Sequence, residues 1–337
     1  MRRLLAEPGA GAIRSKLTLA DAGDQWLRSA EVGRNGRPPC EAATLEQYES
    51  HLRVHIKPLW GHLKLASLDA FKMQDMRAEL LASGISRSMA IKIWTSLKGI
   101  LNEAMIRGVI LGNPAQPIKI GRHRSAEAPV QIPSPHEMRL ILEAADRFTM
   151  SNHLQVREAW ERWRPFLYTA ALTGLRASEL RGLPWSAVGS DEIRVVQRAD
   201  RYSKIGPPKS ASGYRAIAIT AELQDILREW RQKCPVSELD LVFPTISGTV
   251  ENLPNITNRC WRKAQEAALK TTKYGFHAIR HFRASMVIAA GWTPKEVQVE
   301  MGHSSIQVTF DIYGHLFGSG DKRRERARMA QEWLKTA

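Results

Sequence analysis

Apolar residues recur at helical spacing through the first third of the chain. They do so in four segments, residues 18–30, 44–56, 67–83 and 88–107. A repeat of three or four positions is typical of amphipathic helices, and glycine or proline follows each segment within three residues, where helices commonly end. Four short helices predict a small all-α domain over residues 18–114.

Local signals predict where these helices begin and end. Thr18, with Asp21 three residues later, indicates the start of the first helix, and Thr44 with Gln47 predicts a capping box for the second. Pro58 and Gly61 are expected to break the second helix. In the third helix the period places Phe71 among the residues that face the core.

Two segments lack this periodicity. Residues 1–17 precede the first helix and are predicted to form an N-terminal tail. Residues 115–129 combine prolines with basic side chains, among them Lys119, Arg122 and Arg124. This composition predicts an extended basic linker.

Beyond residue 130, helical periods alternate with a short β region. Residues 192–199 and 214–220 alternate between apolar and polar positions, as strands do. Helices are predicted at residues 134–147, 154–173, 221–233, 255–269, 277–290, 294–301 and 305–313, with a charged tail helix from Asp321. The pattern therefore predicts a second domain over residues 130–337 and a mainly α chain with a small antiparallel β-sheet, an α+β fold.

The charge of the chain gives information about its binding partner rather than about its fold. Lys and Arg number 49 against 34 Asp and Glu, which gives a formal net charge of +15. Such an excess indicates a polyanionic partner, most often nucleic acid, although a basic protein without one is the alternative. The three cysteines show no metal-ligand or redox spacing. With no apolar run of membrane-spanning length, we expect no membrane partner and a cytoplasmic, nucleoid-associated location.

Basic groups and one oxygen nucleophile concentrate in short motifs of the second domain. They are Arg176 after Gly174, Lys209 in the turn between the two strands, His277 and Arg280 one helical turn apart, His303 after Gly302, and Tyr313. Arginine donates two parallel hydrogen bonds and stays charged, so two arginines from distant segments can clamp one phosphate. For either arginine alone, a surface salt bridge is the alternative.

Each remaining group has a chemical role that suits attack on a phosphodiester. Tyr313 is the candidate nucleophile; its free pKa is about 10, so it needs a base or a positive field, which the neighbouring cations are expected to supply. Lys209 is the candidate general acid for the leaving 5′-oxygen, or else a phosphate contact without a proton role. His277 and His303 can donate to the phosphate or shuttle the tyrosine proton.

Other candidates have supporting roles. Glu179 is expected to orient an active-site group through a hydrogen bond, and His281 and His315 are interpreted as supporting or packing residues. Candidate DNA contacts are Lys92 and Lys98 on the fourth helix and Arg122 and Arg124 in the linker; solvated side chains are the alternative. The sequence has no carboxylate pair and no P-loop, so neither a metal nor a nucleotide cofactor is expected.

Together these motifs resemble the tyrosine recombinase (phage integrase) family over nearly the whole chain. The run Thr-Gly-Leu-Arg-Ala-Ser-Glu-Leu around Arg176 resembles its first arginine box, and His277-Ala278-Ile279-Arg280-His281 its His-x-x-Arg box, with Ala278 in place of a common acidic residue. The resemblance implies a helical core-binding domain and a catalytic domain that clamp duplex DNA. It implies site-specific cleavage and rejoining through a 3′-phosphotyrosyl intermediate, for integration or excision of a phage or mobile element.

The resemblance also implies partners. It implies a homotetramer on paired recombination sites, a monomer or weak oligomer off DNA, and room for an accessory DNA-bending or directionality factor. The apolar stripe Met329, Ala330, Trp333 and Leu334 is expected to dock into a neighbouring subunit. Two alternatives stay open: a topoisomerase IB-like nicking and closing enzyme that acts as a monomer, and a catalytically silent DNA-binding protein.

Overall fold

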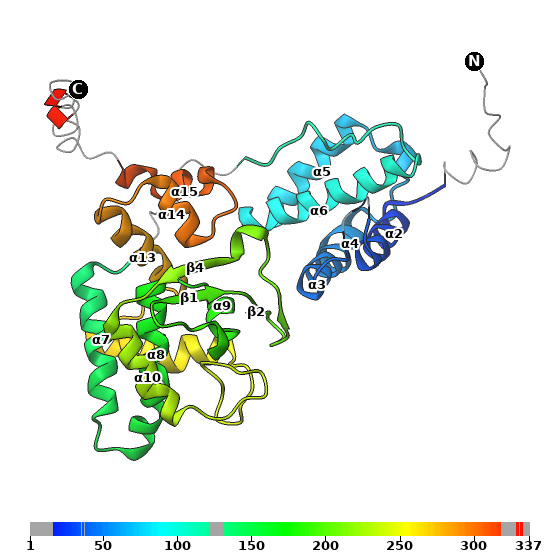
Figure 1. The fold of residues 1–337 in the computed structure, drawn as a ribbon. Helices are drawn as coiled ribbons and strands as arrows, with labels where there is room; N and C mark the ends of the chain where they lie inside the picture. The colour runs from blue at the N-terminus through cyan, green and yellow to red at the C-terminus, as the bar shows by residue number, and fades with distance from the viewer. Residues whose placement is uncertain are drawn as a thin grey trace. The chain divides into compact units, whose positions relative to one another are not determined.

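A computed structural model describes residues 16–34, 36, 38–121, 131–317, 328–329 and 331–332. The chain divides into two units, residues 1–127 and 128–337. The described part of the first is helical, and the described part of the second combines helices with short strands (Figure 1). No helix within the described ranges has both the length and the apolar character needed to cross a membrane.

The first unit packs its helices around a core of tryptophan, leucine, isoleucine and methionine. Its helices are α2 (Leu19–Val32), α3 (Ala42–Ser50), α4 (Lys57–Trp60), α5 (Ala70–Ala82) and α6 (Arg87–Ile106), with a π-helical turn at His51–Ile56 and a 3-10 turn at Leu65–Ser67. The predicted capping box of Thr18 and Asp21 starts α2. The inner face of α6, including Ile93, Leu97 and Ile100, is fully buried.

Three local predictions for this unit are wrong. The second helix begins at Ala42, so Thr44 lies inside its first turn rather than at its cap. Pro58 does not break it, because the preceding turn is π-helical and the run continues to Trp60; the helix ends at Gly61, as expected. The third helix begins after Asp69, whose side chain accepts from the Lys72 N–H, and this phase leaves Phe71 77% exposed.

The first unit extends beyond the boundary expected at residue 114. Ala115 and Ile118 are buried among its helices, so the beginning of the expected linker packs against this core. Arg122 and Arg124 lie outside the described residues.

The second unit confirms the α+β prediction. Its helices are α7 (Pro135–Thr149), α8 (Leu154–Thr173), α9 (Ala177–Arg181), α10 (Ala221–Lys233), α11 (Leu253–Asn255), α12 (Arg262–Leu269), α13 (His277–Ala289), α14 (Pro294–Met301) and α15 (Ile306–Tyr313). Strand β1 (Glu192–Val195) pairs antiparallel with β4 (Arg215–Ala218), and β2 (Arg198–Ala199) pairs with β3 (Ile205–Gly206). The strand expected at 192–199 is therefore split into two.

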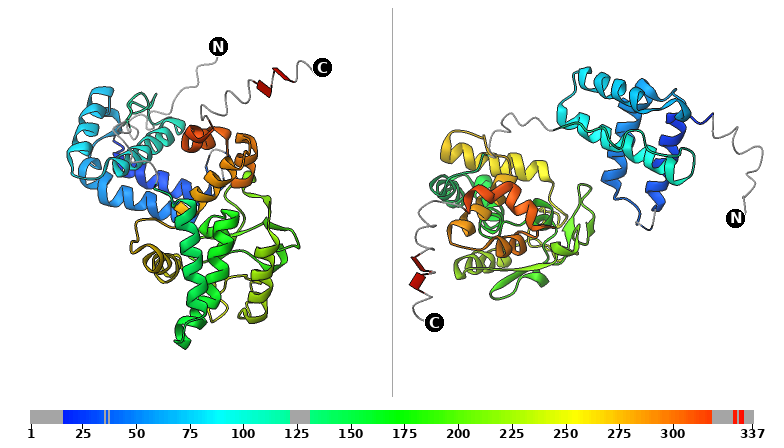
Figure 2. Two further views of the ribbon diagram at one scale, coloured as in Figure 1. Left: turned by 90° about the vertical axis from the view of Figure 1, so that its left-hand side faces the viewer. Right: turned by 90° about the horizontal axis from the view of Figure 1, so that it is seen from above.

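The packing of this unit brings distant segments together at one end. Helices α7 and α8 lie side by side and carry much of the core, with α10, α12 and α13 packed against them (Figure 2). Helices α13, α14 and α15 gather next to β4 (Figure 1). Helix α8 ends at Gly174, whose φ of 64° is the left-handed conformation that glycine adopts readily.

Candidate active site

Four of the predicted site residues come together where α8, α13, α14 and α15 meet. Arg176 Nη2 donates to the carbonyl of Gly302 at 2.7 Å, and Arg280 Nη1 donates to the carbonyl of Gly174 at 2.8 Å. The ring of His303 lies nearly parallel to that of Tyr313, with centroids 6.3 Å apart. The first arginine motif and the C-terminal motifs thus form one cluster.

The end of α14 organises the arginines of this cluster. The last carbonyls of a helix have no intrahelical partner, and here three in succession accept from three different guanidinium groups. Arg215 Nε donates to Glu300 O at 2.8 Å, Arg280 Nη2 donates to Met301 O, and Arg176 Nη2 donates to Gly302 O. The negative end of the helix dipole also favours cations at this position.

Glu179 joins two of these arginines through its buried carboxylate. It accepts from the Arg176 N–H and from Arg176 Nη1, at 2.9 and 2.7 Å, and from both terminal nitrogens of Arg215. Burial disfavours the charged form, but the hydrogen bonds and charge of Arg215, together with Arg176, outweigh it and lower the pKa of Glu179 to about 2. These contacts join Glu179 to Arg176 and Arg215; that it orients an active-site group stays a prediction.

Arg215 was missed in the sequence because it lies outside the recognised motifs. Its side chain is only 2% exposed, and it also donates to Gly213 O at 3.0 Å. One signal in the sequence could have identified Arg215 as a buried residue. It lies in a strand pattern, two positions before Ile217 and four before Ile219. Alternation places all three on one face, and an arginine on an apolar face needs buried acceptors.

Arg280 is another deeply buried cation of the cluster. It is 4% exposed, and desolvation, followed by the charges of Arg176 and Arg215, lowers its pKa to about 9. It remains charged at neutral pH. An anion bound beside it would relieve the repulsion among three guanidinium groups, which makes this cluster suited to a phosphate.

Both predicted histidines are neutral at physiological pH. His303 is buried, its Nδ1 lies 2.9 Å from Thr309 Oγ1, and desolvation followed by the charges of Arg280 and Arg176 lowers its pKa to about 4. The side chain of His277 reaches the surface and is exposed, yet desolvation of its ring, followed by the charges of His281 and Arg280, also lowers its pKa to about 4. A neutral imidazole has one donor and one acceptor nitrogen, so each can donate to a phosphate or pass a proton.

Tyr313 differs from the sequence expectation in its electrostatics. Its side chain is 3% exposed, and burial outweighs the charge of Arg280 and raises its pKa to about 12. The neighbouring cations therefore do not ionise it on their own. Its Oη lies 2.6 Å from Nδ1 of His281, so a residue interpreted as supporting or packing makes direct contact with the candidate nucleophile.

Lys209 lies in the loop that approaches the cluster. The side chain is exposed and makes no hydrogen bond or ion pair with the residues that the structure describes. The same loop reaches the cluster through Ser212, whose carbonyl oxygen lies 2.8 Å from the position a Cβ would take on Gly302. Lys209 stands three residues before Ser212 in this loop, and the structure does not bring its side chain into contact with the other five residues.

The candidate DNA contacts on α6 belong to the first unit. Lys92 is exposed, and Lys98 donates to Gln116 O at 3.1 Å. Desolvation, followed by the charge of Lys119, lowers the pKa of Lys98. The side chain of His315 lies outside the described residues.

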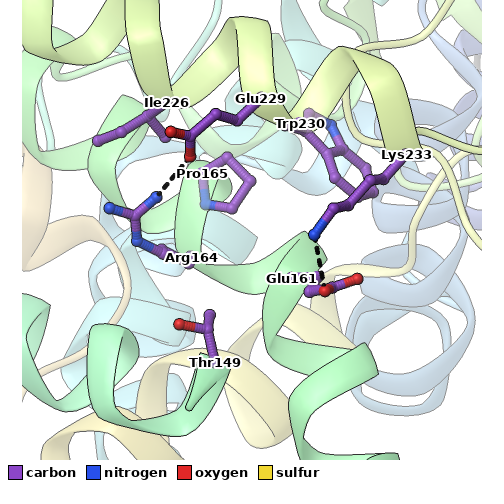
Figure 3. A pocket seen from close by; sticks show the side chains of 8 residues that line it. All are labelled: Thr149, Glu161, Arg164, Pro165, Ile226, Glu229, Trp230 and Lys233. Carbon is purple, nitrogen blue, oxygen red and sulfur yellow. Dashed lines mark hydrogen bonds and ion pairs between the residues drawn. The ribbon is translucent and has the colours of Figure 1, made fainter.

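Two other kinds of site were considered among the described residues: a metal centre and a cavity lined by ion pairs. The described residues contain no group of three or more histidine, cysteine, aspartate or glutamate side chains that could hold a metal ion. A cavity of about 200 Å³ between α7, α8 and α10 is lined by ion pairs, Lys233 with Glu161 and Arg164 with Glu229 (Figure 3). It contains none of the predicted site residues.

Comparison with known proteins agrees with these motifs. Residues 134–319 match the model of the phage integrase family. This match covers more than half of the chain, and the chain belongs to that family.

Curated relatives match over most of their length. The tyrosine recombinase XerC-like protein of Caldanaerobacter subterraneus subsp. tengcongensis is 27% identical over 89% of this chain and 80% of its own. The ICEBs1 integrase of Bacillus subtilis is 22% identical over 84% of this chain and 76% of its own.

Solved structures share the fold. The Tn1549 transposon integrase in complex with a circular intermediate DNA has a TM-score of 0.74 at 20% identity, over 93% of this chain and 99% of its own. A lambda integrase tetramer bound to a Holliday junction has a TM-score of 0.63 at 17% identity, over 91% of this chain and 80% of its own.

Proposed function

We propose that this protein is a site-specific recombinase that cleaves and rejoins duplex DNA, with Tyr313 as the nucleophile. The observation that carries the proposal is the meeting of the Arg176 segment with Arg280, His303 and the buried Tyr313, which lie more than a hundred positions further along the chain. A buried tyrosine among fixed cations is difficult to explain by packing alone, because burying like charges together costs free energy.

In this proposal the protein supplies position and charge. Tyr313 Oη attacks the phosphorus, an O–P bond forms, and the bond to the 5′-oxygen breaks, which leaves a 3′-phosphotyrosyl ester. Arg176 and Arg280 hold the non-bridging oxygens, where negative charge grows in the transition state. Lys209, from its exposed loop, gives a proton to the departing 5′-oxygen. Attack by another 5′-hydroxyl reverses these steps and rejoins the strand without a nucleotide.

The partners follow from the family and from the charge. The net charge of +15 favours duplex DNA, with Lys92 and Lys98 as phosphate contacts of the helical unit. Solved relatives include a tetramer on a Holliday junction, and we extend this to a homotetramer of the present chain on paired sites, weakly associated off DNA, with an accessory DNA-bending or directionality factor. Its place of action would be the cytoplasm, in association with the nucleoid.

The test is the trapping of the covalent intermediate. The junctions of the genetic element that encodes the protein supply the DNA, prepared as a duplex with a nick just beyond the cleavage position and a label on the 5′ end of the cleaved strand. In excess EDTA the wild-type protein should form a labelled adduct on a denaturing gel. Tyr313→Phe should bind this DNA normally and form no adduct.

Two outcomes would contradict this proposal. An adduct formed by Tyr313→Phe would move the nucleophile to another residue. Cleavage that EDTA abolishes and Mg²⁺ restores would indicate a metal-dependent nuclease.

A further inference from the structure

We propose that His281 is the general base that removes the proton from Tyr313 as it attacks the phosphodiester. This assignment rests on the proposed function and adds a catalytic residue to it. A general base must lie within hydrogen-bond reach of the proton that it takes. His281 Nδ1 lies 2.6 Å from Tyr313 Oη, a short contact even among hydrogen bonds between O–H and N or O.

The other histidines of the cluster have different partners. His303 stacks parallel to the tyrosine ring with Nδ1 directed at Thr309 Oγ1. His277 meets the ring of His281 edge to face, with centroids 4.7 Å apart. Among the described residues, His281 is therefore the titratable side chain in hydrogen-bond contact with the reacting oxygen.

Burial of the tyrosine makes such a base necessary. With a side chain that is 3% exposed, Tyr313 has little access to water as a proton acceptor, and its raised pKa opposes ionisation ahead of the reaction. The proton must then move while the new O–P bond forms. It passes from Oη to Nδ1, and the imidazolium returns it to Oη when a 5′-hydroxyl later attacks the phosphotyrosyl ester.

The surroundings keep His281 in the form that a base requires. Desolvation, followed by the charge of Arg280, lowers its pKa, so the ring is neutral at physiological pH. The groups that face it are His277 and Arg280 on its own helix and Tyr313 on α15. The tautomer with the proton on Nε2 leaves Nδ1 free to accept from the tyrosine hydroxyl.

The first test measures single-turnover adduct formation on the nicked duplex. His281→Ala should lower this rate by about 10²–10⁴-fold while DNA binding is retained, and added imidazole should restore part of the rate. His281→Gln, which keeps the ring's approximate volume, should be slow and should not respond to imidazole. His153→Ala, an exposed histidine before α8, is the matched control and should react like the wild type.

The second test separates the base from the acid. A substrate in which sulfur replaces the 5′-bridging oxygen has a leaving group that needs no proton. It should restore the rate of Lys209→Ala and leave His281→Ala slow. The wild-type rate should be flat across neutral pH, because the base is already deprotonated there, whereas the rate of His281→Ala should keep rising as hydroxide takes over.

Specific results would overturn the assignment. A His281→Ala rate equal to or above the wild-type rate would mean that the contact only holds Tyr313 at rest. A slow variant that imidazole does not rescue, or that the sulfur substrate restores, would mean that His281 does not take this proton. Failure of the wild-type protein itself to form an adduct would instead contradict the proposed function.

Discussion

Arg215 holds both oxygens of the Glu179 carboxylate, with Nη2 at 2.9 Å from Oε2 and Nη1 at 3.2 Å from Oε1. The two side chains are 2% and 4% exposed. Glu179 in turn receives Arg176 through the backbone N–H and Nη1. The position of a predicted catalytic arginine thus depends on an ion pair between two residues that need not touch DNA.

This ion pair should make stability depend on pH. The pKa of Glu179 is lowered in the folded chain to about 2, so the unfolded state binds the proton more readily. The stabilisation, about 3 kcal/mol, is present above pH 5 and is lost as the pH falls toward 2. Urea unfolding of wild type and Glu179→Gln should therefore differ more at pH 7 than at pH 3. An equal difference at both pH values would contradict the assigned pKa.

Arg176 and Arg280 should contribute to the transition state more than to binding. Loss of one preorganised donor typically costs about 3 kcal/mol of barrier. We expect Arg176→Ala and Arg280→Ala to slow adduct formation by on the order of a hundredfold or more, with a much smaller change in DNA affinity by gel shift. Arg228→Ala, which removes an exposed ion pair with Asp225, is the control. Equal losses of rate and affinity would mean that these arginines only hold DNA.

The sequence predicted those residues whose types form local motifs. Arg176, Arg280, His303 and Tyr313, which the structure places in one cluster, were predicted as site residues because each stands in a short pattern on a predicted helix or at its end. The sequence did not predict that Arg215 would bind Glu179 or that His281 would contact Tyr313. Both contacts join separate segments, β4 with α9 and α13 with α15. The rise in the pKa of Tyr313 was missed for the same reason, since burial depends on tertiary packing.

Helix boundaries were predicted well where capping chemistry is local. Thr18 with Asp21 starts the first helix, as expected, and the helix predicted from residue 134 starts there through a capping box of Ser134 and Glu137. The helix break predicted at Pro58 was wrong, because a π-helical turn before it accommodates the proline. Helical periodicity in the sequence does not reveal such a turn.

The C-terminal segment should serve assembly. Met329, Ala330, Trp333 and Leu334 recur at helical spacing in the sequence, and burial of Trp333 and Leu334 in a neighbouring subunit would contribute roughly 3–5 kcal/mol before the costs of association. Deletion of residues 321–337 should leave binding to a single site intact and reduce tetramer formation on paired sites. Sedimentation of the protein–DNA complexes measures this. Tetramers formed by the truncated chain at the wild-type concentration would show that the segment serves its own subunit.

Gly302 should link the fold to the chemistry more directly than Gly291 does. Its φ is 60°, and an added Cβ would lie 2.8 Å from Ser212 O and 3.0 Å from Arg215 Nη1. Gly291 also has a positive φ, of 94°, but open space around it. Alanine at either position should cost about 1–2 kcal/mol of stability through the backbone conformation.

Only Gly302→Ala should also disturb the arginines. Its carbonyl accepts from Arg176, and a methyl group here must displace Ser212 or Arg215. A displacement on the order of 1 Å can slow a reaction about a hundredfold. We therefore expect slow adduct formation by Gly302→Ala and a rate close to wild type for Gly291→Ala, measured at a temperature where both are folded by circular dichroism. Equal rates for the two variants would show that the carbonyls at the end of α14 are not what positions the arginines for cleavage.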